Sequence, residues 1–263
     1  MMSYLIICVS ALLVSGLTLF SGFGLGTLLM PVFALFFPVE VAVAATAAVH
    51  LANNVFKAAL VGRHADWRMV LRFAAPAALA AVLGAWLLGQ ISGLEPLARY
   101  HLAGRECAIT WTKLVIAILI LGFAVVELSP GLERLSFPVR YVPLGGAISG
   151  FFGGLSGHQG ALRTAFLIRA GLAKEAFIGT MVVAAIVVDV SRMLVYGLTF
   201  IPHDLSLLQS QEGLRLVAAG SLSAFAGAFL GSRLLKKITM RAIQNTVGVL
   251  LLLLAAALGA GLV

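Results

Sequence analysis

Long apolar runs fill most of this chain, and the short connections between them contain most of its charged residues. Of the 263 residues, 61% are hydrophobic and 11% are charged, and the mean hydropathy is +1.08. Such a surface is stable in lipid, where each backbone N–H and C=O must find its partner within the protein. The runs at 114–126 and 247–262 lack the period-two alternation of a membrane-spanning strand. The sequence therefore predicts an all-α polytopic membrane protein in a lipid bilayer.

The chain is strongly basic, with 18 Lys and Arg against 10 Asp and Glu. These basic residues are spread over the connections, which is typical of the cytoplasmic loops of membrane proteins, so no nucleic-acid partner is expected. Cys8 and Cys107 have no motif spacing, and neither a disulfide framework nor a metal site is expected. The first apolar run, at 5–20, lacks the basic start and the cleavage site of a signal peptide. We interpret it as part of the fold.

Two segments, 19–54 and 150–192, have the same order of parts. Each contains a glycine-rich break in an apolar run, then a short apolar arm, then a long helical segment with polar residues inside it. Moving the first segment forward by 134 positions places Gly26 on Gly160. The chain therefore contains an internal repeat within a single transmembrane domain. Its parts are the first repeat at 1–128, a linker at 129–141 and the second repeat at 142–263.

The arm after each break is about a dozen residues long, which is shorter than the roughly 20 residues that a spanning helix needs. Each repeat is therefore predicted to consist of a glycine-broken, re-entrant-like helix pair and three spanning helices. The predicted spans are 39–61, 69–91 and 113–128 in the first repeat and 174–198, 213–237 and 247–263 in the second. The connection at 92–112 is expected to be an exposed loop.

Basic clusters orient the two repeats. The cluster at 63–72 precedes the 69–91 helix, whereas the cluster at 233–241 follows its counterpart at 213–237. If both clusters are cytoplasmic, equivalent helices run in opposite directions and both termini are periplasmic. Inverted repeats with broken helices are the plan of many secondary transporters, where the N-termini of half-helices bind anions at the midplane.

The breaks read SGFGLGTLLMP at 21–31 and FFGGLSGHQG at 151–160, and A-x-x-x-T at 42–46 and AFIGT at 176–180 follow them. These motifs resemble the TauE/SafE (TSUP) family of sulfite exporters, and the resemblance covers nearly the whole chain. It implies a permease or exporter of small sulfur-containing anions, such as sulfite or sulfoacetate, in the bacterial inner membrane. The first break has fewer glycines than is common in that family, and His158 and Gln159 occupy positions where glycines are frequent. The exact substrate is therefore left open.

Polar residues within the membrane are the candidates for substrate binding, because a charge at the bilayer centre costs at least about 2.5 kcal/mol. Glycines let the backbone approach a ligand, and arginine presents several donors to an oxyanion. The candidate substrate-binding residues are Ser21, Gly22, Gly24, Gly26, His50, Asn53, Asn54, Lys57, Ser156, Gly157, His158, Gln159, Gly160, Arg163 and Arg192. Asp189, one turn before Arg192, is expected to form an ion pair with it, in a structural role or as the carrier of a coupling proton.

Several candidates also have a purely structural explanation. Lys57 lies near the end of its helix, where a lysine reaches the lipid headgroups. Arg163 could belong to a hairpin that stays on the cytoplasmic side. Buried Asn and His side chains join helices, and polar residues at a break, such as Ser156, cap half-helices.

We therefore expect a secondary transporter that binds a small anion between the two breaks. The alternatives are a carrier of another small carboxylate, a membrane subunit that docks a partner through small-residue faces at Gly84 and Gly227, and an intramembrane enzyme using His50, His158 and Asp189. Since no catalytic, cofactor or metal motif occurs in the sequence, no enzyme activity and no cofactor are expected. Transport direction, coupling ion and oligomeric state stay open, with a homodimer among the alternatives.

Overall fold

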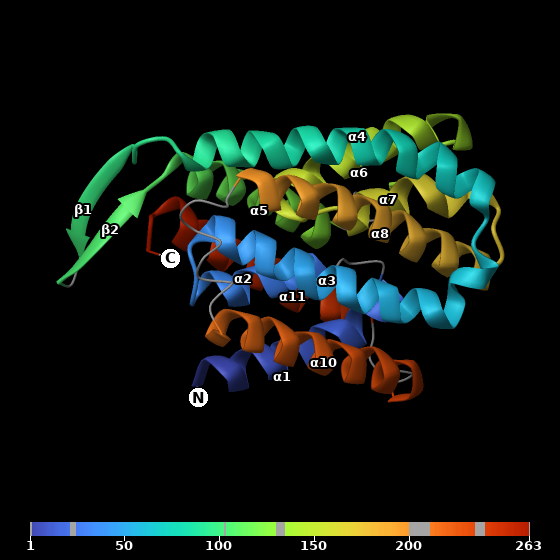
Figure 1. The fold of residues 1–263 in the computed structure, drawn as a ribbon, viewed down its shortest axis with the longest axis horizontal. Helices are drawn as coiled ribbons and strands as arrows, with labels where there is room; N and C mark the ends of the chain where they lie inside the picture. Colours follow the sequence, from blue (N-terminus) through green and yellow to red (C-terminus); the bar gives the residue numbers. More distant parts are fainter. Residues whose placement is uncertain are drawn as a thin grey trace.

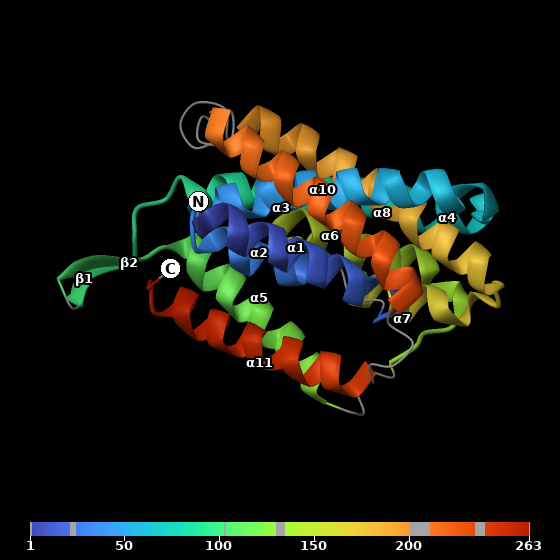
Figure 2. The ribbon, with the colours of Figure 1, turned by 90° about the horizontal axis from the view of Figure 1, so that it is seen from below.

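The computed structural model describes residues 2–21, 25–102, 104–129, 135–199, 211–234 and 240–262. Most of the described chain is helical, and the long helices lie side by side in one bundle (Figures 1 and 2). The α-helices are α1 (Met2–Ser21), α2 (Leu25–Ala34), α3 (Val39–Val61), α4 (Trp67–Ser92), α5 (Trp111–Leu128), α6 (Val142–Ser156), α7 (Gly160–Leu167), α8 (Lys174–Thr199), α10 (Gln211–Leu234) and α11 (Met240–Gly259). Short 3₁₀ turns occupy Gly62–His64, Val139–Tyr141 and Ile168–Ala170.

Four stretches of helix in the described residues are long and apolar enough to cross a membrane. They are Val39–His64, Trp67–Ser92, Lys174–Thr199 and Glu212–Leu230, and shorter apolar helices cover Met2–Gly16, Trp111–Val126 and Gly248–Gly259. Large apolar side chains point outward from the bundle, and Leu79 and Leu198 are 77% and 80% exposed. Such an outer surface suits lipid, so the prediction of a helical membrane protein is confirmed.

Two helices end at glycine-rich segments. Helix α6 is followed by Gly157, which has a φ of 83°, and α7 begins at Gly160. A residue with a side chain would be strained at that φ, so glycine allows the chain to turn out of α6 here. Helix α1 ends at Ser21 and α2 begins at Leu25, with the intervening residues outside the described part of the chain. The short helices α2 and α7 have 10 and 8 residues, too few to cross a bilayer.

Helices from the first half of the chain pack against helices from the second half. Helix α4 packs on α6, α10 on α1, α3 on α8 and α5 on α11. Figure 1 shows α3 running away from the end that carries the N and C labels, while α8 runs back toward it. Buried polar side chains of both halves, such as His50 of α3 and Asp189 of α8, meet at the α3–α8 contact.

Small residues allow very close packing in two of these pairs. A Cβ atom on Gly84 would lie only 2.2 Å from the carbonyl oxygen of Phe151, so α4 touches the backbone of α6. A Cβ atom on Gly227 would lie 2.1 Å from the carbonyl oxygen of Leu12, which joins α10 to α1 in the same way. The predicted close helix contacts at these glycines are confirmed. Because both faces are used within the chain, neither is free to dock a partner protein.

The prediction of a loop over residues 92–112 is wrong for most of that segment. It forms an antiparallel hairpin of β1 (Ala98–Leu102) and β2 (Arg105–Ile109), which extends beyond the helices in Figure 1. The turn contains Gly104, whose φ of 77° suits a tight reversal. The hydroxyl of Tyr100 donates to the carbonyl of Ala260, which attaches the hairpin to the end of the last helix. The all-α fold class is corrected in this one respect.

The close contact at Gly84 predicts that a single added methyl group lowers the stability of the protein. We expect Gly84→Ala to lower the free energy of unfolding by about 1–3 kcal/mol, because the α4 and α6 backbones must move apart. Gly122→Ala on α5 is the matched control, since its Cβ atom would meet no atom within 4 Å. Thermal unfolding of the purified protein in detergent measures both changes, and equal melting temperatures would contradict the proposed packing.

Candidate functional site

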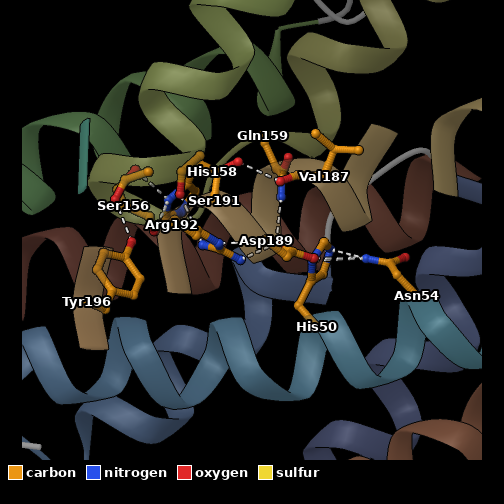
Figure 3. A network of polar contacts seen from close by, with 12 residues as sticks. His50, Asn54, Ser156, His158, Gln159, Val187, Asp189, Ser191, Arg192 and Tyr196 are labelled. Atoms are coloured by element: carbon orange, nitrogen blue, oxygen red, sulfur yellow. Dashed lines mark hydrogen bonds and ion pairs between the residues drawn. The ribbon is translucent and has the colours of Figure 1, made fainter. Parts of the chain in front are cut away.

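The carboxylate of Asp189 on α8 is the centre of a buried polar network (Figure 3). Its Oδ1 accepts hydrogen bonds from Gln159 Nε2 at 3.0 Å and from Arg192 Nε and Nη2 at 3.1 and 2.7 Å. Its Oδ2 lies 2.6 Å from His50 Nδ1 and 3.3 Å from Asn54 Nδ2. A carboxylate has about four lone-pair sites, so these donors use its full capacity to accept. Asp189 is therefore held as an anion.

The spacing of these residues along α3 and α8 places each pair on one face of its helix. His50 and Asn54 are four residues apart on α3, and Asp189 and Arg192 are three apart on α8, so each pair shares one side of its helix. Asp189 and Arg192 are both 0% exposed. Since a buried charge is stable only when it is paired and hydrogen-bonded, the two residues depend on each other.

Side chains of α8 also hold the break between α6 and α7. Arg192 Nη1 donates to the carbonyl oxygen of Gly153 at 3.0 Å, and the Tyr196 hydroxyl donates to the carbonyl of Gly154. A Cβ atom on Gly157 would lie 3.2 Å from Arg192 Nη1, so the absence of a side chain there leaves room for the guanidinium. Ser149 Oγ donates to the Gln159 backbone carbonyl at 3.0 Å. The break is thus fixed by bonds on both sides.

The start of α2 touches this break. A Cβ atom on Gly26 would lie 3.1 Å from the carbonyl oxygen of Gly157 and 3.7 Å from Thr46 Cγ2 on α3. Helix α7 begins three residues after Gly157, so the N-termini of both short helices begin near one place. The first N–H groups of a helix lack intrahelical partners and carry partial positive charge. An anion between α2 and α7 would meet such groups on both sides.

Positive charge exceeds negative charge in this buried region. Arg163 on α7 is 6% exposed and donates from Nη1 to Gln159 Oε1 at 3.1 Å. It forms no ion pair with a carboxylate among the residues that the structure describes. Asp189 offsets the charge of Arg192, which leaves the Arg163 guanidinium without a counterion. Lys57, half-buried on α3, adds a further positive charge on the same side of its helix as His50 and Asn54.

Several buried polar side-chain atoms have no hydrogen-bond partner within the described chain. They include Asn53 Nδ2, His158 Nε2, Arg163 Nε and Thr46 Oγ1. A buried donor or acceptor without a partner costs about 1–3 kcal/mol. Two of these atoms are obligatory N–H donors, on Asn53 and Arg163. The unsatisfied Nε of Arg163 belongs to a buried cation and is suited to an oxyanion.

The structure joins six of the residues singled out from the sequence in one hydrogen-bonded network. They are His50, Asn54, Gln159, Arg163, Asp189 and Arg192. Asn53 and His158 are buried but are not part of this network, and Asn53 Oδ1 accepts from Ser15 Oγ at 3.4 Å. Lys57 makes no hydrogen bond in the described structure, and Gly22, Gly24 and the Ser21 side chain lie outside the described residues.

Two other candidates have contacts of a structural kind. Ser156 Oγ donates to the carbonyl oxygen of Phe152, four residues earlier in its own helix, at 3.1 Å, which is a bond within α6 and not a cap of the next helix. His158 contacts Ser156 and stacks on Phe123, whereas His50 bonds Asp189. The enzyme alternative requires His50, His158 and Asp189 within hydrogen-bond reach of one another. No hydrogen bond within the described residues links His158 to the His50–Asp189 pair.

Sequence reasoning missed three residues of the site: Ser149, Tyr196 and Phe123. Tyr196 lies four residues after Arg192 in an apolar helix, and that spacing could have revealed it. No feature of the sequence around Ser149 distinguishes it from other serines within helices. Phe123 is one of many apolar residues in α5, and only the packing of α5 against the break selects it.

Comparison with known families identifies the class of protein to which this chain belongs. A family model for the sulfite exporter TauE/SafE matches residues 6–258, nearly the whole chain. The chain belongs to the TauE/SafE sulfite exporter family. Comparisons with curated proteins and with solved structures gave no match. TauE/SafE proteins form a family of membrane transporters for sulfite and related sulfur anions, and a positively charged site in an apolar protein suits such a substrate.

The buried ion pair of Asp189 and Arg192 in this TauE/SafE protein predicts that one isosteric substitution strongly lowers the stability of the fold. We expect Asp189→Asn to destabilise the fold by about 3–5 kcal/mol, because Arg192 then has a buried charge without a counterion. The exposed pair of Arg99 and Glu106, 3.5 Å apart, provides the control. Glu106→Gln is expected to change stability by only about 0–1 kcal/mol, since water already screens that pair. Thermal unfolding in detergent measures both, and a similar effect of the two variants would contradict this assignment.

Proposed function

We propose that this TauE/SafE protein is a secondary carrier of a small sulfur-containing anion, such as sulfite or sulfoacetate, across the bacterial inner membrane. The anion binds at mid-membrane, between the start of α2 and the break before α7. The observation that carries the proposal is Arg163, a buried guanidinium with an unpartnered Nε and no carboxylate partner among the described residues. An oxyanion supplies both the missing charge and the missing acceptor.

The proposal includes two inverted repeats, at 1–128 and 142–263. Reciprocal contacts support it, because α4 of the first half packs on α6, the first helix of the second, while α10 packs on α1. The equivalent helices α3 and α8 also pack on each other, and they run in opposite directions in Figure 1. Halves related in this way can rock against each other and expose a site between them to each side in turn.

The proposed orientation places both termini in the periplasm. In Figure 1 the N and C labels and the β1–β2 hairpin lie at one end of the bundle, and the turn between α3 and α4 lies at the other. That turn and the start of α4 contain the exposed residues Arg63, His64 and Arg68. Cytoplasmic ends of spanning helices are enriched in Lys and Arg, which favours the cytoplasm for this end.

Cysteine labelling in whole cells tests the orientation. In a Cys8→Ala, Cys107→Ala background, we expect a membrane-impermeant maleimide to label Glu95→Cys, at the hairpin end of α4, in intact cells. Arg68→Cys, at the opposite end of α4, should react only after the membrane is permeabilised. Glu95 and Arg68 are both exposed, so accessibility within the protein does not differ. The reverse labelling pattern would place the termini in the cytoplasm.

Transport by purified protein in liposomes tests the function itself. We expect movement of sulfite, a sulfonate or a short carboxylate down its gradient, and Arg163→Gln should slow it about 10- to 150-fold at low substrate concentration. This range follows from about 1.5–3 kcal/mol for a hydrogen bond to a charged group, with a factor of ten for each 1.4 kcal/mol. Arg169→Gln, an exposed residue six positions later, is the matched control and should transport at the normal rate. Equal rates for the two variants would remove Arg163 from the site.

A further inference from the structure

The imidazole of His158 lies within the break and has one ring nitrogen without a partner. Its side chain is 2% exposed and stacks on Phe123, with ring centroids 5.1 Å apart. The residues on either side belong to the site: the Gly157 carbonyl touches the start of α2, and Gln159 bonds Asp189. Its Nε2 is one of the buried atoms that have no hydrogen-bond partner within the described structure.

The contacts of Nδ1 determine which nitrogen carries the proton in the neutral ring. Nδ1 lies 3.0 Å from the carbonyl oxygen of Ser156 and 3.1 Å from Ser156 Oγ. A carbonyl oxygen can only accept, and the Ser156 hydroxyl already donates to Phe152. Nδ1 must therefore be the donor. In the neutral ring, Nε2 is then a bare lone pair that needs a hydrogen-bond donor.

The charged groups around the break do not supply that donor. Arg192 of α8 donates to Gly153 and Asp189, and Arg163 of α7 donates to Gln159. Helix α5 presents the apolar ring of Phe123. The Asp189 carboxylate accepts hydrogen bonds from four side chains, so its lone pairs are already used and none is left to take up a proton. His158 lies in the break beside this network, and its buried Nε2 can take up a proton without the loss of an existing bond.

We propose that the anion binds together with one proton, which is shared between His158 Nε2 and an oxygen of the anion. This inference rests on the proposed anion site and adds its coupling ion. A ligand with an acidic hydroxyl, such as hydrogen sulfite, brings the proton and donates it toward Nε2. A sulfonate has no such hydroxyl, so Nε2 takes a proton from solution and donates it to a sulfonate oxygen. The bound state contains the same N–H–O bridge in both cases.

Proton uptake during binding tests the proposal on the unmodified protein. Titration calorimetry of methanesulfonate in several buffers of different ionisation enthalpy gives the number of protons taken up. We expect about one proton per anion at a pH where the free imidazole is neutral, and the affinity should then fall about tenfold for each further pH unit. Sulfite in alkaline solution, where it is mostly the dianion, should also bind with uptake of about one proton.

Two variants assign the proton to its residue. His158→Gln presents an amide N–H to the anion without titrating, so its affinity for methanesulfonate should not change with pH. His64→Gln removes an exposed histidine at the cytoplasmic end and should keep the uptake of one proton. Retained proton uptake in folded His158→Gln protein would overturn the assignment to His158.

The outcomes separate this inference from the proposed function. At a pH where the free imidazole is neutral, binding of methanesulfonate or of the sulfite dianion by the wild-type protein without proton uptake overturns the inference and leaves the anion site intact. Failure of both anions to bind at any pH removes the site and the inference together. If His158→Gln does not fold, the proton count of the wild-type protein still decides whether a proton binds with the anion.

Discussion

The rest of the structure depends on the hydrogen bonds and the ion pair made by the buried carboxylate of Asp189. A charge in a dry interior is tolerated only when donors surround it, and here the donors come from three separate segments. Arg192 lies on the same helix, His50 and Asn54 lie on α3, and Gln159 lies in the break. The position of each segment is therefore tied to that of the others. A relative movement of the two halves must keep these donors on the carboxylate or exchange them.

The same network explains why the break is rigid and still chemically incomplete. Arg192 and Tyr196 donate hydrogen bonds to the backbone carbonyls of Gly153 and Gly154. These bonds fix the end of α6 just before the turn at Gly157. Arg163 is held by Gln159, which is itself oriented by Asp189. In the proposed anion site, rigid positioning lowers the free-energy cost of binding, because the donors are already ordered before the anion arrives. The incomplete part is the acceptor that Arg163 Nε lacks within the described structure.

The sequence predicts what depends on composition and on spacing along one helix. The apolar runs predict the helices, and the three-residue spacing places Arg192 beside Asp189, where the structure has the ion pair. Contacts between distant segments could not be predicted, because they depend on how α3, α8 and the break pack together. Neither the Gln159–Asp189 bond nor the contact of Gly26 with Gly157 follows from any local pattern. The hairpin was missed because two five-residue strands give little signal between long apolar helices.

The proton shared with His158 changes the force that acts on the transported anion. Each elementary charge that crosses the membrane contributes about 2.3 kcal/mol per 100 mV, so an inside-negative potential drives a lone anion outward. A sulfonate that crosses together with one proton carries no net charge, and the potential then contributes nothing. Direction is set instead by the gradients of the anion and of the proton. The residue that completes the hydrogen bonding of the site would then also determine which gradient drives transport.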